Sequence, residues 1–122
     1  MTPPVFALLN ASAAVKALIG ASPMRCWEDV APQESTPLRP YIVWSVVGGT
    51  PENYLDQVPT MDSGRVRLGV WSNSVTERRT LANAVIAAIE PSAYMVGIPV
   101  GTYEPETKLF GYWIDFQFWV AR

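Results

Sequence analysis

Histidine is missing from this sequence, and cysteine occurs once, at Cys26. Without histidine the chain lacks the commonest general base, the commonest metal ligand and every Ser-His or Cys-His nucleophile pair. A lone thiol forms no internal disulfide and, with no histidine beside it, no zinc site. These absences point away from an enzyme, and we expect no metal and no cofactor.

Charged residues are also scarce, at 16% of the chain, and nine basic against eleven acidic residues give a net charge of −2. We therefore expect no basic surface that could bind nucleic acid electrostatically. Hydrophobic residues make up 49%, which predicts that some apolar surface meets a partner. No apolar run is long enough to span a membrane, and the first residues lack the positive segment of a signal peptide. We expect a protein that is made in the cytoplasm and has no membrane partner.

The 122 residues fit one domain, spanning 1–122, with two predicted helices. The first covers residues 3–19, with Thr2 as N-cap and Gly20 just past its end. The second begins at Ser74, because Ser74 and Glu77 have the spacing of a capping box, and ends before Pro91. Each helix has an apolar stripe at three- and four-residue steps. The stripes are Val5, Leu8, Leu9, Ser12, Val15 and Ile19 in the first helix, and Leu81, Val85 and Ile89 in the second.

Strands are predicted at residues 24–29, 41–47, 65–72 and 109–121, with a further candidate over 94–100. Residues 31–40 contain three prolines, and residues 48–64 contain two prolines and three glycines. Both segments are therefore expected to be irregular loops. The order of elements predicts an α+β fold, with an antiparallel or mixed β-sheet and two α-helices packed on one face.

Along residues 65–72 and 109–121, apolar positions alternate with positions that mix tryptophan, arginine and polar side chains. The apolar set is predicted to face the helices, and the mixed set to form the opposite face. Tryptophan and arginine are favoured at the centres of protein interfaces, so this face is a candidate interface. The alternative is that the chain's own loop over 48–64 covers it. Its members are Arg65, Arg67, Trp71, Trp113, Asp115, Gln117 and Trp119.

The acidic residues form no convincing hydrolytic pair. Glu28 and Asp29 are adjacent and diverge on a strand, Glu104 and Glu106 lie in a predicted loop, and Asp115 stands alone. Hydrolysis by two acids requires both in one dry cleft. We assign no catalytic residue.

Three segments carry a family resemblance when they are taken together. They are the helix of residues 8–20, the strand start Pro40-Tyr41-Ile42-Val43 after a proline-rich loop, and the strand Arg65-Val66-Arg67-Leu68-Gly69-Val70-Trp71-Ser72 directly before a helix. The ending over residues 115–120 fits the same pattern. From about residue 5 to 120 the chain resembles the small tail-completion or tail-terminator proteins of siphophages, a group of minor tail proteins.

This resemblance implies a structural protein in the tail of the virion, at the head-tail junction. Copies of the chain would form a homo-oligomeric, hexameric ring on the head-proximal end of the tail tube, stop tube polymerisation and offer the head-docking surface. The implied partners are the chain itself, the tail tube protein and the head-completion or connector protein. DNA would only pass non-specifically through the lumen. The candidate lumen or tube-facing loop residues are Glu52, Tyr54, Asp56 and Asp62.

Two other interpretations remain open from the sequence. A head-completion or neck adaptor protein would also be small, poor in histidine and ring-forming. A small α+β ligand-binding or enzymatic domain would use Asp115 and Tyr112 in a pocket beneath the tryptophan face. The last interpretation predicts a monomer or dimer with a pocket, whereas the terminator interpretation predicts a ring with a central hole.

Overall fold

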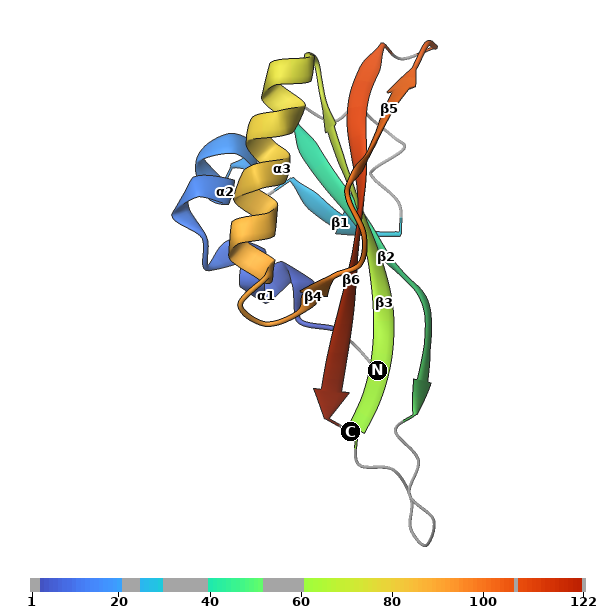
Figure 1. Cartoon of the computed structure of the whole chain (residues 1–122). Helices are drawn as coiled ribbons and strands as arrows, with labels where there is room; N and C mark the ends of the chain where they lie inside the picture. Colours follow the sequence, from blue (N-terminus) through green and yellow to red (C-terminus); the bar gives the residue numbers. More distant parts are fainter. Residues whose placement is uncertain (1–2, 21–24, 30–39, 52–60, 107, 122) are drawn as a thin grey trace, which may run out of the picture.

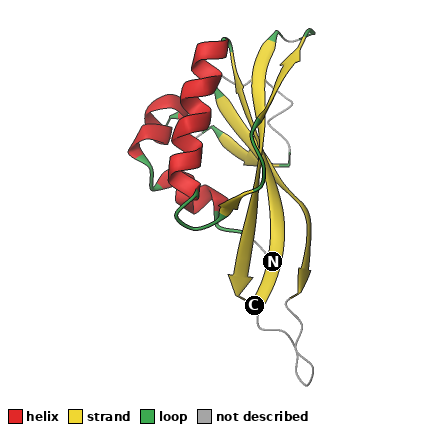
Figure 2. Cartoon of the chain, viewed as in Figure 1, coloured by secondary structure: helices red, strands yellow, loops and turns green. Residues whose placement is uncertain are grey.

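The computed structural model describes residues 3–20, 25–29, 40–51, 61–106 and 108–121, and shows a mixed sheet with helices on one face (Figures 1 and 2). The predicted α+β class is confirmed, but the described residues form three helices rather than two. No helix within these ranges is long and apolar enough to cross a membrane. In chain order the elements are α1 (Val5–Asn10), α2 (Ala13–Ile19), β1 (Cys26–Glu28), β2 (Tyr41–Pro51), β3 (Met61–Ser72), α3 (Val75–Ile89), β4 (Tyr94–Met95), β5 (Val100–Glu104) and β6 (Leu109–Ala121).

The single helix predicted over residues 3–19 is wrong, because the chain breaks at Ser12. Ser12 has an extended backbone, and its side chain accepts a hydrogen bond from the backbone N–H of Val15, so it caps a new helix. Serine is favoured at this position because it satisfies a donor that the first helical turn leaves unpaired. Gly20 closes α2 at a φ of 87°, as expected for glycine after a helix. Thr2 lies outside the described residues.

The strands are arranged in the order β1-β2-β3-β6-β4, and β5 pairs with the same outer edge of β6 as β4 does. β1 runs parallel to β2, and every other pairing is antiparallel. The sheet is therefore mixed, which is one of the two forms that the sequence allowed. β1 is shorter than the predicted strand over 24–29, and the candidate over 94–100 is replaced by β4 and β5 on either side of Gly97.

The predicted irregular loop over 48–64 is wrong at both of its ends. β2 continues to Pro51 and β3 begins at Met61, so both ends of this segment are strands (Figure 1). The pairing of β2 with β3 shifts in register between Val46 and Gly48, where β2 has one extra residue in a bulge. This bulge accommodates the glycines within the strand. Backbone pairing with β3 thus overrides a composition that is typical of loops. Residues 52–60 lie outside the described part of the chain.

Helix α3 begins as predicted at Ser74, whose side chain accepts a 3.1 Å hydrogen bond from the N–H of Glu77. The returning bond differs from the expected capping box. The Glu77 carboxylate accepts from the N–H of Asn73 at 3.3 Å, one residue earlier than the box requires. Two side-chain hydrogen bonds therefore stabilise the first turn of α3.

The core lies between the helices and one face of β2, β3 and β6. The alternation predicted for β3 and β6 is confirmed, because Val66, Leu68, Ile114, Phe116 and Phe118 are almost completely buried. The helices supply the facing layer through their predicted stripes. Its fully buried members are Val5, Leu9, Val15, Ile19, Leu81, Val85 and Ile89.

Candidate interface on the open face of the sheet

The sheet face opposite the helices (Figure 2) is called the open face below, and the strand register places the candidate interface residues on it. β3 and β6 pair so that Arg65 lies opposite Gln117 and Arg67 lies opposite Asp115. Side chains two residues apart on a strand share a face. The structure therefore brings all seven predicted residues together on two neighbouring strands: Arg65, Arg67 and Trp71 on β3, and Trp113, Asp115, Gln117 and Trp119 on β6.

Two tryptophans pack close to the sheet on the open face because a glycine stands opposite each of them. Trp113 is paired with Gly69, and Trp71 with Gly111. The two indole rings meet edge to face, with centroids 5.4 Å apart. A Cβ atom at Gly111 would lie 2.7 Å from the Trp71 ring, and one at Gly69 would lie 2.9 Å from both rings. Trp71 and Trp113 therefore form an aromatic floor that exists only while both glycines are present.

Replacing Gly111 by alanine tests this arrangement. The new methyl group would also lie 2.9 Å from the backbone oxygen of Val70. We expect the free energy of unfolding to fall by about 1–2 kcal/mol, because overpacking forces the ring and strand apart. Gly48→Ala is the matched control, since a Cβ there meets nothing within 4 Å. Equal losses for the two variants in chemical denaturation would contradict the packing described here.

Arg67 and Asp115 form a two-pronged ion pair beside the aromatic floor. Arg67 Nε donates to Asp115 Oδ1 at 2.9 Å, and its Nη2 donates to Oδ2 at 3.2 Å. The hydrogen bond to Asp115, followed by the charge of that carboxylate, raises the pKa of Arg67. Exposed pairs of this kind add little stability, but this pair fixes both side chains and leaves Asp115 engaged as a structural partner.

A hollow of about 310 Å³ opens on this face above the aromatic floor. Its lining combines the rings of Tyr41, Trp71 and Trp113 with three charged side chains, those of Arg67, Asp29 and Glu104. The sequence did not identify Tyr41, Asp29 or Glu104 as members of this site. Alternation with the buried Ile42 would have placed Tyr41 on the open face. No local pattern places Asp29 and Glu104 there, because their position depends on the path of the chain.

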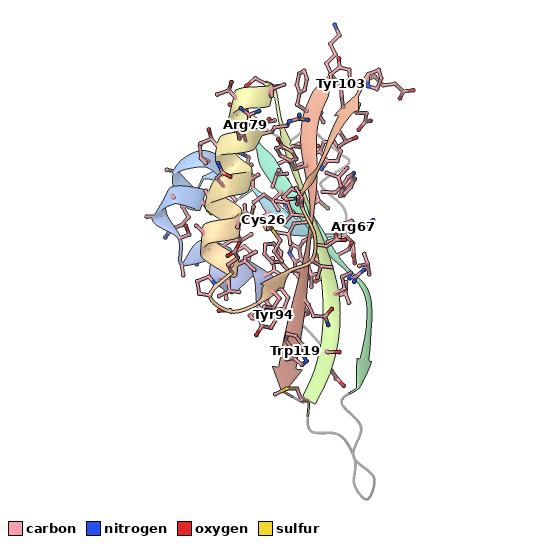
Figure 3. All side chains as sticks on the ribbon, viewed as in Figure 1. Cys26, Arg67, Arg79, Tyr94, Tyr103 and Trp119 are labelled. Atoms are coloured by element: carbon pink, nitrogen blue, oxygen red, sulfur yellow. The ribbon has the colours of Figure 1, made fainter. Side chains whose placement is uncertain are left out.

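Three aromatic side chains on the open face are exposed in the isolated chain. Trp113 is 39% exposed, Trp119 is 44% exposed, and Tyr94, which packs edge to face against Trp119, is 69% exposed. Figure 3 shows Tyr94 and Trp119 side by side on their strands. Of the three candidate tryptophans, only Trp71 is half-buried. Trp113 and Trp119 therefore keep a large part of their ring surface in contact with solvent.

Among the described residues, the predicted loop and the predicted ligand pocket add nothing to the site on the open face. Asp62 lies on β3 opposite Val120 and is half-buried, whereas Glu52, Tyr54 and Asp56 fall outside the described residues. Asp115 and Tyr112, which were expected to share a pocket, lie on opposite faces of the sheet. Tyr112 points to the helix side of the sheet and packs against the core, while Asp115 binds Arg67 on the open face. The ligand-binding interpretation therefore loses its proposed site.

Arg78, on α3, connects the helix to the sheet through hydrogen bonds. Its Nη1 atom donates to the carbonyl oxygens of Thr102 on β5 and Gly111 on β6, at 3.0 and 3.1 Å. The guanidinium also lies over the ring of Tyr112, 4.5 Å from its centroid. The short strand β5 is thus held in place from the helix side.

We expect Arg78→Met to lower the free energy of unfolding by about 2–3 kcal/mol, because hydrogen bonds from a charged donor are lost and two carbonyls lose a partner. Arg79→Met is the control. Arg79 is the next residue on α3, and it is exposed, so its replacement should change stability by less than about 0.5 kcal/mol. Guanidinium chloride denaturation measures both, and similar values for the two variants would refute the role of Arg78.

Comparison with known proteins identifies the family. The model of the family described as "Tail completion protein gp17" matches residues 3–121, which is nearly the whole chain. The chain belongs to this family. A comparison with curated protein sequences gave no match. Among solved structures, a chain from the virion of a native gene transfer agent (GTA) particle has a similar fold, with a TM-score of 0.59 and 17% identity over 97% of this chain and 92% of that chain.

Membership of the tail completion family confirms the resemblance seen in the sequence. The protein is a structural component of a phage-type virion, located in the tail, and has a role in tail completion. Within the described ranges, no three histidine, cysteine, aspartate or glutamate side chains are grouped so that they could hold a metal ion. For such a protein the open face is of interest as a contact surface, and the seven residues on it remain candidates.

Proposed function

We propose that copies of this chain form a hexameric ring that caps the head-proximal end of the tail tube. The ring ends polymerisation of the tube and presents the surface onto which the head-completion or connector protein docks. DNA passes through its lumen without specific contacts. Family membership supports a role in tail completion, and the ring and its two neighbours are our proposal.

One observation carries the proposal: the open face keeps large aromatic side chains exposed. Trp113, Trp119 and Tyr94 lie on one side of β6 and its partner strand β4. Large aromatic residues dominate the energetic centres of protein interfaces, where burial removes their surface from water. A closed ring also requires each subunit to present two different surfaces to its neighbours, and the fold supplies one helical face and one open sheet face.

Electron microscopy of growing tail tubes tests the proposal. The purified chain is added to tube protein during polymerisation, beside a control with tube protein alone. We expect tubes of arrested length with a ring at one end. Tubes that grow unchanged would reject the terminator role, and binding to isolated connectors without an effect on tubes would favour the neck adaptor.

The Trp113→Ala variant links this result to the open face. We expect the fraction of capped tubes to fall at least tenfold at a fixed chain concentration, with a loss of only about 1–2 kcal/mol in the free energy of unfolding, because the side chain is already 39% exposed. Tyr103→Ala is the matched control. Tyr103 is similarly exposed, at 47%, but it packs against Phe110, away from the open face. Capping and folding that fail together in Trp113→Ala would contradict an interface role.

A further inference from the structure

The hollow on the open face has the features of a built site. Its aromatic floor, Trp71 and Trp113, packs close to the sheet in the space left by Gly69 and Gly111, where added Cβ atoms would lie within 3.0 Å of the rings. Tyr41 adds a third ring to the lining. Of these rings, Trp113 is 39% exposed, whereas Trp71 and Tyr41 are half-buried.

The charge of the hollow is negative once its internal ion pair is counted. Arg67 is neutralised by Asp115, which binds two of its nitrogen atoms. The remaining charged groups in the lining are the carboxylates of Asp29 and Glu104, both on exposed residues. Among the residues that the structure describes, neither carboxylate has an ion-pair partner. An anion such as a DNA phosphate is therefore disfavoured.

Aromatic rings beside carboxylates suit a guanidinium group. Arginine stacks on aromatic faces through its cation and binds carboxylates with paired hydrogen bonds. The chain already places one guanidinium over a ring on its other side, where Arg78 lies 4.5 Å from the centre of the Tyr112 ring and donates to backbone carbonyls. The hollow of about 310 Å³ offers three rings and two acids to one such side chain.

A second copy of the chain carries a suitable group on its helix layer. Arg79 lies on α3 and is exposed, and its side chain has no hydrogen bond or ion pair with any other described residue. Figure 3 shows Arg79 on the helix side of the sheet and Arg67 on the opposite side. A contact between the helix layer of one copy and the open face of the next joins two different surfaces, which is the kind of contact that closes a ring.

We propose that the hollow above Trp71 and Trp113 binds the Arg79 side chain of a neighbouring copy, between the rings and the carboxylates of Asp29 and Glu104. The inference rests on the proposed ring, and it names the contact that holds two subunits together. It also explains why the open face combines aromatic rings with acids that lack a partner within the described chain.

Charge reversal tests the pairing on the full-length chain. The variants are Arg79→Glu, Glu104→Arg and the double variant, with Glu106→Arg as the control for a matched change in net charge at an exposed residue two positions away. Self-association is measured by sedimentation velocity, alone and with tail tubes, and thermal unfolding verifies the fold. We expect each single reversal to weaken association at least tenfold, the double variant to recover to within about threefold of the wild type, and Glu106→Arg to match the wild type.

Each other outcome is decisive. Single reversals that associate like the wild type, or a double variant that stays as weak as the singles, would overturn the pairing of Arg79 with the hollow. A wild-type chain that stays monomeric both alone and with tubes would overturn it as well. A wild-type chain that forms rings sensitive to these reversals but leaves tubes uncapped would support the pairing and refute the proposed capping function.

Discussion

Replacement of Phe116 by alanine is expected to lower the free energy of unfolding by about 3–5 kcal/mol. Phe116 is fully buried on β6, opposite Val66 of β3 on one side and Met95 of β4 on the other. Removing the ring sacrifices its burial and leaves a cavity that strands on both sides prevent from collapsing. Urea denaturation followed by tryptophan fluorescence measures the change.

Phe6→Ala serves as the control for this prediction. Phe6 lies on α1 and is 49% exposed, so its truncation should cost less than about 1 kcal/mol. A loss below about 1 kcal/mol for Phe116→Ala would show that the side chain faces away from the core. A comparable loss at Phe6 would show that α1 packs differently from the structure described here.

The thiol of Cys26 is expected to react with Ellman's reagent about a thousandfold more slowly in the native chain than in the unfolded chain at pH 8. Burial raises the pKa of Cys26 from 9.0 to about 12, and only the thiolate is a nucleophile. The side chain lies on β1 on the helix side of the sheet, 6% exposed. Reaction in guanidinium chloride gives the reference rate.

An exposed cysteine provides the matched control. Asn83 is exposed on α3, so the Cys26→Ala/Asn83→Cys variant should react at the same rate whether it is folded or unfolded. Fast labelling of Cys26 in the native wild type would contradict its burial.

The same burial makes stability depend on pH, because the unfolded chain releases the thiol proton more readily than the native chain does. The contribution of the protonated Cys26 thiol to the free energy of unfolding is complete below pH 9 and is lost as pH rises toward 12. The Cys26→Ala variant should not show this loss.

Features that depend on short-range patterns were predictable from the sequence. The alternation of β3 and β6 assigned Val66, Leu68, Ile114 and Phe116 to the core, as the structure shows. The serine-initiated start of α3 was also correct. In both cases the signal lies within a few neighbouring residues, because side-chain period and helix capping are local properties of the backbone.

The errors in the predicted elements have identifiable causes. The break at Ser12 was missed because serine was counted as one position in an apolar stripe, although its hydroxyl competes for a backbone donor. The strand ends over 48–51 and 61–64 were missed because their glycines and proline are typical of loops. There, pairing with residues far along the chain supplies the order that local composition does not.

The sequence by itself determined the α+β class, the buried faces of β3 and β6 and, through its family resemblance, a place in the virion tail. Only the tertiary structure decided what the open face looks like. The register of β3 against β6 sets each tryptophan over a glycine and joins Arg67 to Asp115, and the chain path brings Asp29 and Glu104 beside the same hollow. Periodicity assigns a residue to a face, whereas the neighbours it meets there depend on strand register and topology, which are set by contacts distant in sequence.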